Sequence, residues 1–176
     1  MSVSINSDTP IDGLALIRRS GFEDHRGYFL ATYVEGELNH LLPPGVRFLE
    51  DDISFSRRNV LRGLHGDQHT WKLVSCLVGE VFFAVADLRS SSPTFKATFH
   101  GQLKAEEGLQ VLVPPGCVNG YQCLSDFTLF AYKQSCVYAA GQQLTVRWND
   151  PSIGIPWPAQ DPILSDRDRT APFINF

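Results

Sequence analysis

Polar and titratable side chains interrupt several otherwise apolar segments of this 176-residue chain, where a purely structural strand would carry hydrophobic residues. Such side chains can exchange protons or bind a polar ligand when they line the interior of a β-barrel. The residues that stand out in this way are Arg62 and His65 in 60–65, Lys72 in 71–73, Tyr132 in 130–133, Tyr138 shortly after it, and Asp168 in 164–168. They are the candidates for a functional site.

The segment 61–65 decides whether two of these candidates can act together. In a regular strand Arg62 and His65 would point to opposite faces, because successive side chains alternate. A bulge at Gly63 would bring both to the same side, and a glycine inside a strand commonly marks such an irregularity. Taken alone, His65 would more often be a structural imidazole held by hydrogen bonds.

Strand patterns dominate the chain after residue 47, whereas helical periodicity is nearly absent. The sequence predicts one short helix, over 35–42, which Pro43 and Pro44 end. Clusters of turn-forming residues separate the apolar runs, and the runs over 72–78 and 81–88 flank a tight turn at Gly79. The predicted strand runs are 72–78, 81–88, 95–103, 109–113, 128–138 and 144–148.

Many short strands in a chain of this length indicate a closed or double-sheet antiparallel architecture. The all-β class is therefore expected, as a jelly-roll β-barrel of the cupin type with short helices. An immunoglobulin sandwich is disfavoured because the Cys…Trp…Cys framework is missing. The last 25 residues are rich in Pro and Asp and are expected to form an extended arm over the barrel. Residues 1–176 are expected to form one domain.

Composition narrows the function classes. The net charge of −4 offers no broad basic face for nucleic acid. No run of 18 apolar residues predicts a membrane span, and the first residues lack the features of a secretory signal. The four cysteines form no C-x-x-C pair and are expected to be free thiols in a reducing cytosol. We therefore expect a cytoplasmic protein that binds neither nucleic acid nor membrane.

A metal site is the main alternative that a cupin barrel raises. His65 and His69, with Glu80 downstream, could supply two imidazoles and a carboxylate. The intervening Gly-Asp-Gln segment makes it difficult for both imidazoles to enter the barrel. In the second half of the chain, the spacing that metal-binding cupins use ends in Asn119, a poor ligand for such metals. No metal is expected.

Nine short motifs occur in order between residues 12 and 172. They are Asp24–Phe29 (DHRGYF), Asn59–His65 (NVLRGLH), Lys72–Val74, Gly79–Val81, Ser92–Phe95, Val113–Gly116, Tyr132–Lys133, Trp148–Pro151 and Pro162–Ser165 with Asp168. Together they resemble the dTDP-4-dehydrorhamnose 3,5-epimerase family. The resemblance implies a cofactor-independent, metal-free cupin enzyme, an isomerase that inverts C3, C5 or both in a nucleotide-linked 4-keto-6-deoxy sugar for deoxysugar and surface polysaccharide biosynthesis.

The resemblance also implies roles for individual residues. His65 matches the family's general base, paired with a carboxylate that matches Asp168, and Tyr132 matches the general acid on the opposite face. Lys72 matches a lysine near the keto oxygen. The expected substrate-binding residues are Arg26, Phe29, Asp52, Arg62, Asn119 and Tyr138. The family forms homodimers, and the N-terminal segment with Arg26 is expected to contribute to the partner's site.

Several departures from the family pattern keep alternatives open. Asn119 occupies a position that is His in the rhamnose-pathway enzymes, and Ala31 replaces a Glu. Residues 50–52 read Glu-Asp-Asp where Gln-Asp-Asn is typical, and His65 is followed by Gly-Asp-Gln in place of an aromatic residue and Gln. A C3-only or C5-only epimerase of a GDP-linked 4-keto sugar or heptose therefore stays open. A non-catalytic sugar-binding cupin is the other alternative.

Overall fold

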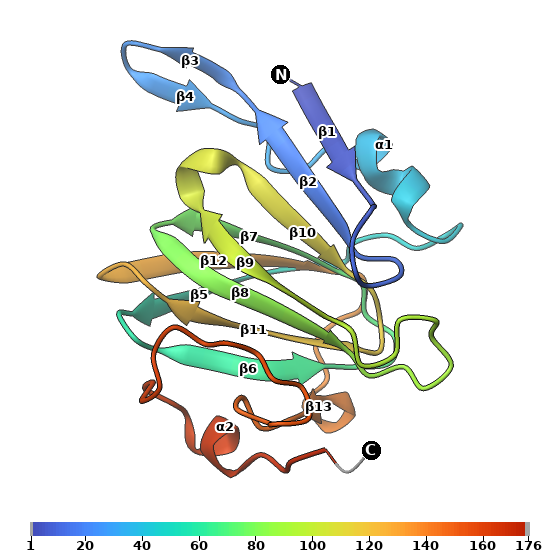
Figure 1. Ribbon diagram of the computed structural model, residues 1–176. Helices are drawn as coiled ribbons and strands as arrows, with labels where there is room; N and C mark the ends of the chain where they lie inside the picture. The colour runs from blue at the N-terminus through green and yellow to red at the C-terminus, as the bar shows by residue number, and fades with distance from the viewer. Residues whose placement is uncertain (1, 175–176) are drawn as a thin grey trace.

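The computed structural model describes residues 2–174 and consists mainly of two antiparallel β-sheets that face each other (Figure 1). The six-stranded sheet has the order β1 (Ser2–Asn6), β2 (Ala15–Ser20), β10 (Leu109–Val113), β7 (Lys72–Val78), β12 (Phe127–Gln134) and β5 (Glu50–Arg57). The five-stranded sheet has the order β13 (Leu144–Thr145), β6 (Leu61–Gly66), β11 (Cys117–Cys123), β8 (Glu80–Asp87) and β9 (Thr98–Lys104). The predicted all-β jelly roll of the cupin type is confirmed.

The core lies between the two sheets, whose strands turn alternate side chains toward each other. Three aromatic side chains fill its centre: Phe83 of β8, Tyr121 of β11 and Phe130 of β12, all fully buried. The rings of Tyr121 and Phe130 stack with centroids 4.4 Å apart, and the ring of Phe83 lies 5.8 Å from that of Phe130. Each aromatic pair adds about 0.5–1.5 kcal/mol beyond its burial. The stack therefore holds the two walls of the barrel in a fixed relation.

The turn predicted at Gly79 is present, but it connects the two sheets. It joins β7 of the six-stranded sheet to β8 of the five-stranded sheet. Gly79 has φ +81°, and a Cβ atom there would lie 2.5 Å from the carbonyl oxygen of Phe127. Only glycine fits this crossing without displacing its neighbours.

Several predicted boundaries differ from the observed ones. The helix expected over 35–42 is α1 (Glu35–Leu38) followed by the 3₁₀ turn η1 (Asn39–Leu41). The strand expected over 128–138 ends at Gln134, because both of its neighbours begin there: Gln134 pairs with Glu50 and with Lys72. The residues that follow form a loop with the 3₁₀ turn η3 (Ala140–Gln142), and the strand expected over 144–148 is reduced to Leu144–Thr145. The strand expected from residue 95 begins at Thr98 and is followed by the 3₁₀ turn η2 (Ala105–Glu107).

The sequence did not predict the strands before residue 47. These are β1, β2 and the two-stranded hairpin of β3 (Phe22–Asp24) and β4 (Gly27–Phe29). In Figure 1 this hairpin projects from the upper end of the molecule, beyond β2. Its aromatic side chains Phe22, Tyr28 and Phe29 are exposed.

The C-terminal arm packs on the outer face of the five-stranded sheet, as expected. Trp148 and Trp157 are buried there against Leu61, Phe82 and other outward-facing side chains of the sheet. The indole N–H of Trp157 donates to the carbonyl of Trp148 at 2.7 Å. The arm also contains a short helix that was not predicted, α2 (Asp166–Thr170).

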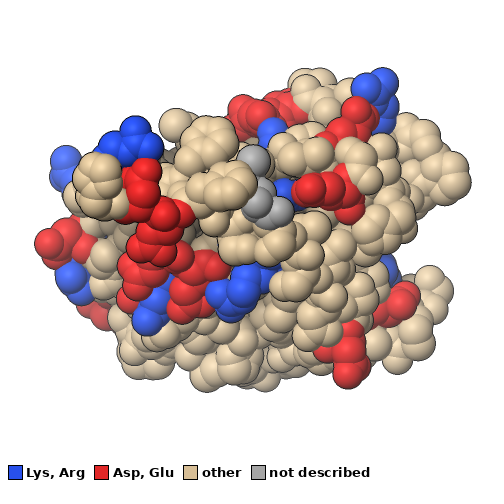
Figure 2. All heavy atoms as spheres, turned by 90° about the horizontal axis from the view of Figure 1, so that it is seen from above, with Lys and Arg blue, Asp and Glu red and all other residues tan. Residues whose placement is uncertain are grey.

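Neither helix of the described part of the chain is long and apolar enough to cross a membrane. On the face shown in Figure 2, Lys and Arg lie among Asp and Glu, and uncharged residues cover a broad continuous area.

Candidate active site

A cavity of about 270 Å³ opens between the two sheets. Both sheets line it, together with the loop between β12 and β13. The residues around it are Glu50 and Asp52 of β5, Arg62 and His65 of β6, Lys72 of β7, Asn119 of β11, Tyr132 and Gln134 of β12, and Tyr138 and Gln143 of the loop. Most of the site residues expected from the sequence therefore meet at one place.

An irregularity in β6 brings Arg62 and His65 to this cavity. His65 pairs with Asn119 and Arg62 pairs with Tyr121, so two residues of β6 lie opposite one residue of β11. Gly63 has φ +138°, and a Cβ atom there would lie 2.6 Å from the Cα atom of Gly120. The bulge predicted at Gly63 is present, and its two flanking side chains share the cavity.

His65 is paired with a buried carboxylate. Its Nε2 atom lies 2.5 Å from Oδ1 of Asp168, whose side chain is 3% exposed, against 26% for the imidazole. An ionised carboxylate only accepts hydrogen bonds, so Nε2 carries the proton and Nδ1 keeps a free lone pair. Asp168 is fixed because its backbone N–H donates to Oγ of Ser165, the N-cap residue of α2.

Lys72 brings an ammonium group into the cavity wall. Its side chain is buried, and this burial lowers the pKa of the amine, as does the nearby charge of Arg167, whereas Asp67 opposes the shift. A buried ammonium interacts more strongly with a negative oxygen than an exposed one does, because less water screens it.

Tyr132 reaches the cavity from the other wall. It lies on β12 of the six-stranded sheet, whereas His65 lies on β6 of the five-stranded sheet. Burial raises the pKa of the Tyr132 phenol, while the charge of Arg62 acts in the opposite direction. The phenol is therefore fully protonated at neutral pH and can donate a proton.

Two expected substrate-binding residues do not line this cavity. Arg26 and Phe29 lie on the β3–β4 hairpin and are exposed. The guanidinium of Arg26 forms an ion pair with Asp24 at 2.6 Å. Neither residue reaches the cavity of its own chain.

Sequence reasoning missed three residues that line the cavity: Glu50, Gln134 and Gln143. Two of them could have been inferred from the sequence. Glu50 lies two residues from Asp52, and Gln134 lies two residues from Tyr132, so each shares a strand face with an expected site residue. Gln143 lies in the loop and carries no such pattern.

Within residues 2–174 no group of three or more His, Cys, Asp or Glu side chains is arranged to hold a metal ion. His65 and His69 thus do not form the two-histidine set considered from the sequence.

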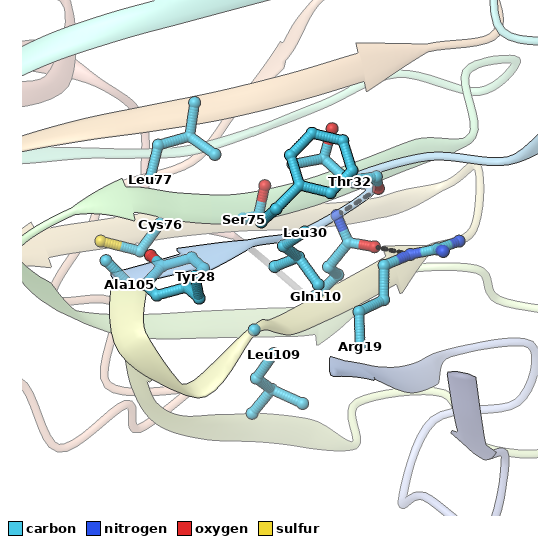
Figure 3. A pocket seen from close by; sticks show the side chains of 12 residues that line it. Arg19, Tyr28, Leu30, Thr32, Ser75, Cys76, Leu77, Ala105, Leu109 and Gln110 are labelled. Carbon is cyan, nitrogen blue, oxygen red and sulfur yellow. Dashed lines mark hydrogen bonds between the residues drawn. The ribbon is translucent and has the colours of Figure 1, made fainter. Parts of the chain in front are cut away.

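A second cavity, of about 280 Å³, lies on the outer side of the six-stranded sheet beneath β4 (Figure 3). Arg19 donates to Oε1 of Gln110 at 3.0 Å, and the amide of Gln110 donates to the carbonyl of Thr32 at 2.9 Å. The other lining residues are mainly apolar, and no acid–base pair is present among them. The cavity between the sheets is therefore the candidate active site.

Comparisons with known proteins identify the family of the chain. The sequence model of the dTDP-4-dehydrorhamnose 3,5-epimerase family matches residues 8–175. The chain is 38% identical over 171 residues to a dTDP-4-dehydrorhamnose 3,5-epimerase of Salmonella typhimurium. The matched region covers 95% of this chain and 93% of that protein.

Two solved structures have the same fold. The first is a dTDP-6-deoxy-D-glucose-3,5-epimerase from Legionella pneumophila in complex with dTDP-4-keto-L-rhamnose, with a TM-score of 0.91, 35% identity, and coverage of 98% of this chain and 93% of that one. The second is a 3′-monoepimerase from Streptomyces bikiniensis in complex with dTDP-quinovose, with a TM-score of 0.87, 28% identity, and coverage of 93% and 84%. The chain belongs to the dTDP-4-dehydrorhamnose 3,5-epimerase family.

Proposed function

We propose that this protein is an isomerase that inverts C3 and C5 of a dTDP-linked 4-keto-6-deoxy sugar. The observation that carries the proposal is the placement of His65 and Tyr132 on opposite walls of one cavity. Lys72, the first residue of β7, lines the same cavity and belongs to the same sheet as Tyr132. A base on one side and an acid on the other are what inversion of a carbon centre requires.

The keto group makes the chemistry accessible to an imidazole. A carbonyl at C4 acidifies the hydrogens on C3 and C5, because the electron pair left behind spreads onto the carbonyl oxygen. His65 removes the proton, and Asp168 stabilises the imidazolium that forms. The ammonium of Lys72 stabilises the enolate oxygen, and one well-placed donor of this kind contributes about 3–4 kcal/mol.

Tyr132 completes the inversion by delivering a proton to the opposite face of the carbon. Its raised pKa keeps the proton on the phenol until the enolate has formed. His65 cannot perform this step, because it approaches the ring from the face that loses the proton.

Polar groups around the acid and base suit the rest of the substrate. Arg62 is held by Ser56 and the carbonyl of Phe55, and its Nη1 has no partner among the described residues, so it suits a diphosphate oxygen. Oδ1 of Asn119 is buried without a hydrogen-bond partner among the described residues, and it suits a sugar hydroxyl. Asp52 and Tyr138 line the same cavity and complete the set within one chain.

The sugar and the number of inverted centres are the finer parts of the proposal. Double inversion of a dTDP sugar is favoured because the family model and the relatives that are 38% and 35% identical to this chain are named as 3,5-epimerases. Inversion of C3 alone is the second candidate, because that monoepimerase has the same fold.

A homodimer would complete the site. Apolar side chains are exposed on the outer face of the six-stranded sheet, where the rings of Phe55 and Phe127 stack 5.8 Å apart next to Ile53, Leu77 and Val78. A second copy of the chain could cover this face and place its Arg26 and Phe29 at the neighbouring cavity. The whole chain then acts as a single cupin domain within the dimer.

We also propose that the reaction takes place in the cytoplasm, where it would serve deoxysugar and surface polysaccharide biosynthesis. The four cysteines are free thiols, as is usual in a reducing compartment.

The test is incubation with dTDP-4-keto-6-deoxyglucose in D2O, followed by NMR of the products. Deuterium at C3 and C5, with new configurations at both carbons, is expected. A GDP-linked 4-keto sugar in a parallel reaction shows which nucleotide the enzyme prefers. Deuterium at C3 alone would establish a monoepimerase, and no deuterium at either carbon would leave a sugar-binding protein without catalysis.

A further inference from the structure

The pair of His65 and Asp168 joins two distant parts of the chain. His65 lies on β6 and Asp168 on α2, and 103 residues separate them. Helix α2 has only five residues, and a helix that short does not hold its own position without contacts to its neighbours. The alignment of the pair therefore depends on what anchors the chain on either side of α2.

The chain before α2 is anchored directly to the strand that carries His65. The backbone N–H of Ile163 donates to the carbonyl of Asn59 at 2.8 Å. The carbonyl of Ile163 accepts from the N–H of Leu61, the first residue of β6, at 3.0 Å.

The chain after α2 is anchored through residues 144–150, which we call the clamp segment. On one side the clamp segment pairs with β6. Thr145 of β13 lies opposite His65, and Val146 and Leu64 exchange two backbone hydrogen bonds of 3.0 and 3.1 Å. The clamp segment and the strand of the candidate base are thus parts of one sheet.

On its other side the clamp segment holds the residues that follow α2. The backbone N–H of Arg147 donates to the carbonyl of Pro172 at 2.9 Å, and its Nε donates to the carbonyl of Ala171 at 2.7 Å. The guanidinium also lies over the ring of Phe173, 4.9 Å from its centre. Arg147 therefore binds three successive residues directly after the helix.

Asp150 fixes the same stretch further along. It is 2% exposed, and its Oδ2 accepts from the backbone N–H of Ile174 at 2.6 Å, while Oδ1 accepts from that of Ser152 at 2.8 Å. Hydrogen bonds to a charged acceptor are stronger than those between neutral groups. The two ends of the clamp segment are therefore both tied down.

A third contact reaches α2 itself. Nε and Nη2 of Arg167 lie 3.0 and 2.5 Å from Oγ1 of Thr145 and donate to it. Arg167 directly precedes Asp168, and Thr145 lies opposite His65. This contact links the chain neighbour of the acid to the strand neighbour of the base.

We propose that the clamp segment aligns the carboxylate of Asp168 with the imidazole of His65, with Thr145, Arg147 and Asp150 as positioning residues. The inference rests on the proposed function, in which His65 is the base. In the step concerned, the C–H bond of the sugar breaks, its proton passes to Nδ1 of His65, and its electron pair passes to the keto oxygen. The imidazolium that forms donates from Nε2 to Asp168, so a displaced carboxylate stabilises it less well.

The variant Arg147→Met removes the side-chain donor to Ala171. With dTDP-4-keto-6-deoxyglucose in D2O, we expect kcat for deuterium exchange to fall about 10–100-fold at every exchanging carbon, as for a misplacement of about 1 Å near reacting groups. KM should change little, because Arg147 does not line the cavity.

Thr145→Val is a milder second variant, which removes only the hydroxyl that accepts from Arg167. It should lower kcat in the same direction, and it provides the test if Arg147→Met does not fold. Arg58→Met is the matched control. Arg58 also donates to a backbone carbonyl, that of Leu124, but it lies outside the clamp segment and the cavity lining, and its loss should keep the wild-type rate.

A double-mutant cycle distinguishes a positioning role from a structural one. Asp168→Asn removes the carboxylate charge on which the clamp segment is proposed to act. If Arg147 acts through Asp168, adding Arg147→Met to Asp168→Asn should lower the exchange rate by less than about twofold. The same loss in both backgrounds would show that Arg147 only stabilises the fold, and the inference would be wrong.

The outcomes separate the inference from the function on which it rests. If wild-type protein exchanges no deuterium, the proposed function is wrong, and the role of the clamp segment in it is wrong as well. If wild-type protein inverts the sugar and folded Arg147→Met and Thr145→Val exchange at its rate, the function stands and the clamp segment has no part in it.

Discussion

At the scale of single residues, the proposed function makes proton removal depend on His65. Its imidazole contacts the buried carboxylate of Asp168 and also lines the cavity, and no second histidine among residues 2–174 lines that cavity. His65→Ala should therefore lower deuterium exchange at every inverted carbon by about 10²–10⁴-fold, the usual contribution of a general base. NMR of the sugar in D2O measures this rate.

His69→Ala is the matched control for that prediction. His69 is exposed, lies four residues away and is absent from the cavity lining. Its loss should leave the exchange rate unchanged. Exchange near the wild-type rate in His65→Ala would show that another group removes the proton.

Tyr132→Phe tests the second proton transfer. The base on the other wall is untouched, so exchange with retained configuration should continue while inversion at one or more carbons falls. The configuration of the product, read from NMR coupling constants, is the measurement. Products with the wild-type configuration, formed at the wild-type rate, would contradict the assignment of Tyr132 as the acid.

Some of the side chains that line the cavity could be predicted from the sequence alone, and others could not. His65, Lys72 and Tyr132 were predictable because each interrupts an apolar run with a group that can exchange a proton or carry charge. Gln143 was not, because it lies in a loop and carries no strand pattern.

At the scale of elements, runs of apolar residues bounded by turns predicted the strands best. The strand over 109–113 and the strand over 72–78 match β10 and β7. Strand β5 was harder to interpret because its polarity is inverted: its inner face carries Asp52, Ser54 and other polar groups, while its apolar residues face outward. Helix α2 was missed because the Pro- and Asp-rich arm around it indicated extended chain, although Ser165 and Asp168 have the spacing of an N-cap.

The end of β8 is held by one buried carboxylate. Asp87 accepts hydrogen bonds from Arg89, Ser92 and Thr94 and so closes the loop that leads into β9. Burial raises the pKa of this carboxyl, but the hydrogen bonds outweigh burial and lower the pKa to about 2. The folded state therefore binds a proton at Asp87 less readily than the unfolded state does.

This difference predicts how stability depends on pH. Because the folded pKa lies below the unfolded value of 3.8, the stabilisation is present above pH 4 and is lost as the pH falls toward 2. Asp87→Asn should lower the free energy of unfolding at pH 7 by about 2 kcal/mol. Urea unfolding at pH 7 and pH 3 should show the gap between wild type and variant narrowing at the lower pH.

Asp126→Asn provides the control for Asp87. Asp126 forms an exposed ion pair with Arg58, and such pairs contribute about 0–1 kcal/mol. A gap for Asp87→Asn that stays constant between pH 7 and pH 3 would show that the carboxylate charge is not what stabilises the loop.

At the scale of the whole molecule, one chain supplies both the proposed acid and the proposed base, but Arg26 lies away from their cavity. The β3–β4 hairpin projects beyond the barrel, and Phe22, Tyr28 and Phe29 on it are exposed (Figure 1). Together with the apolar outer face of the six-stranded sheet, this favours a dimer in which each hairpin serves the neighbouring site. Light scattering should give twice the mass of the chain.

Mixing two inactive variants tests whether Arg26 crosses between subunits. In a heterodimer of His65→Ala and Arg26→Ala, one site receives both defects if Arg26 acts on the neighbouring subunit, and the other site is intact. Random exchange of subunits makes half of the dimers mixed, so about a quarter of the wild-type activity should return. If Arg26 serves its own chain, every site carries one defect and the mixture stays inactive. Mixing His65→Ala with Tyr132→Phe gives the control, because both residues line the cavity of one chain and no activity should return.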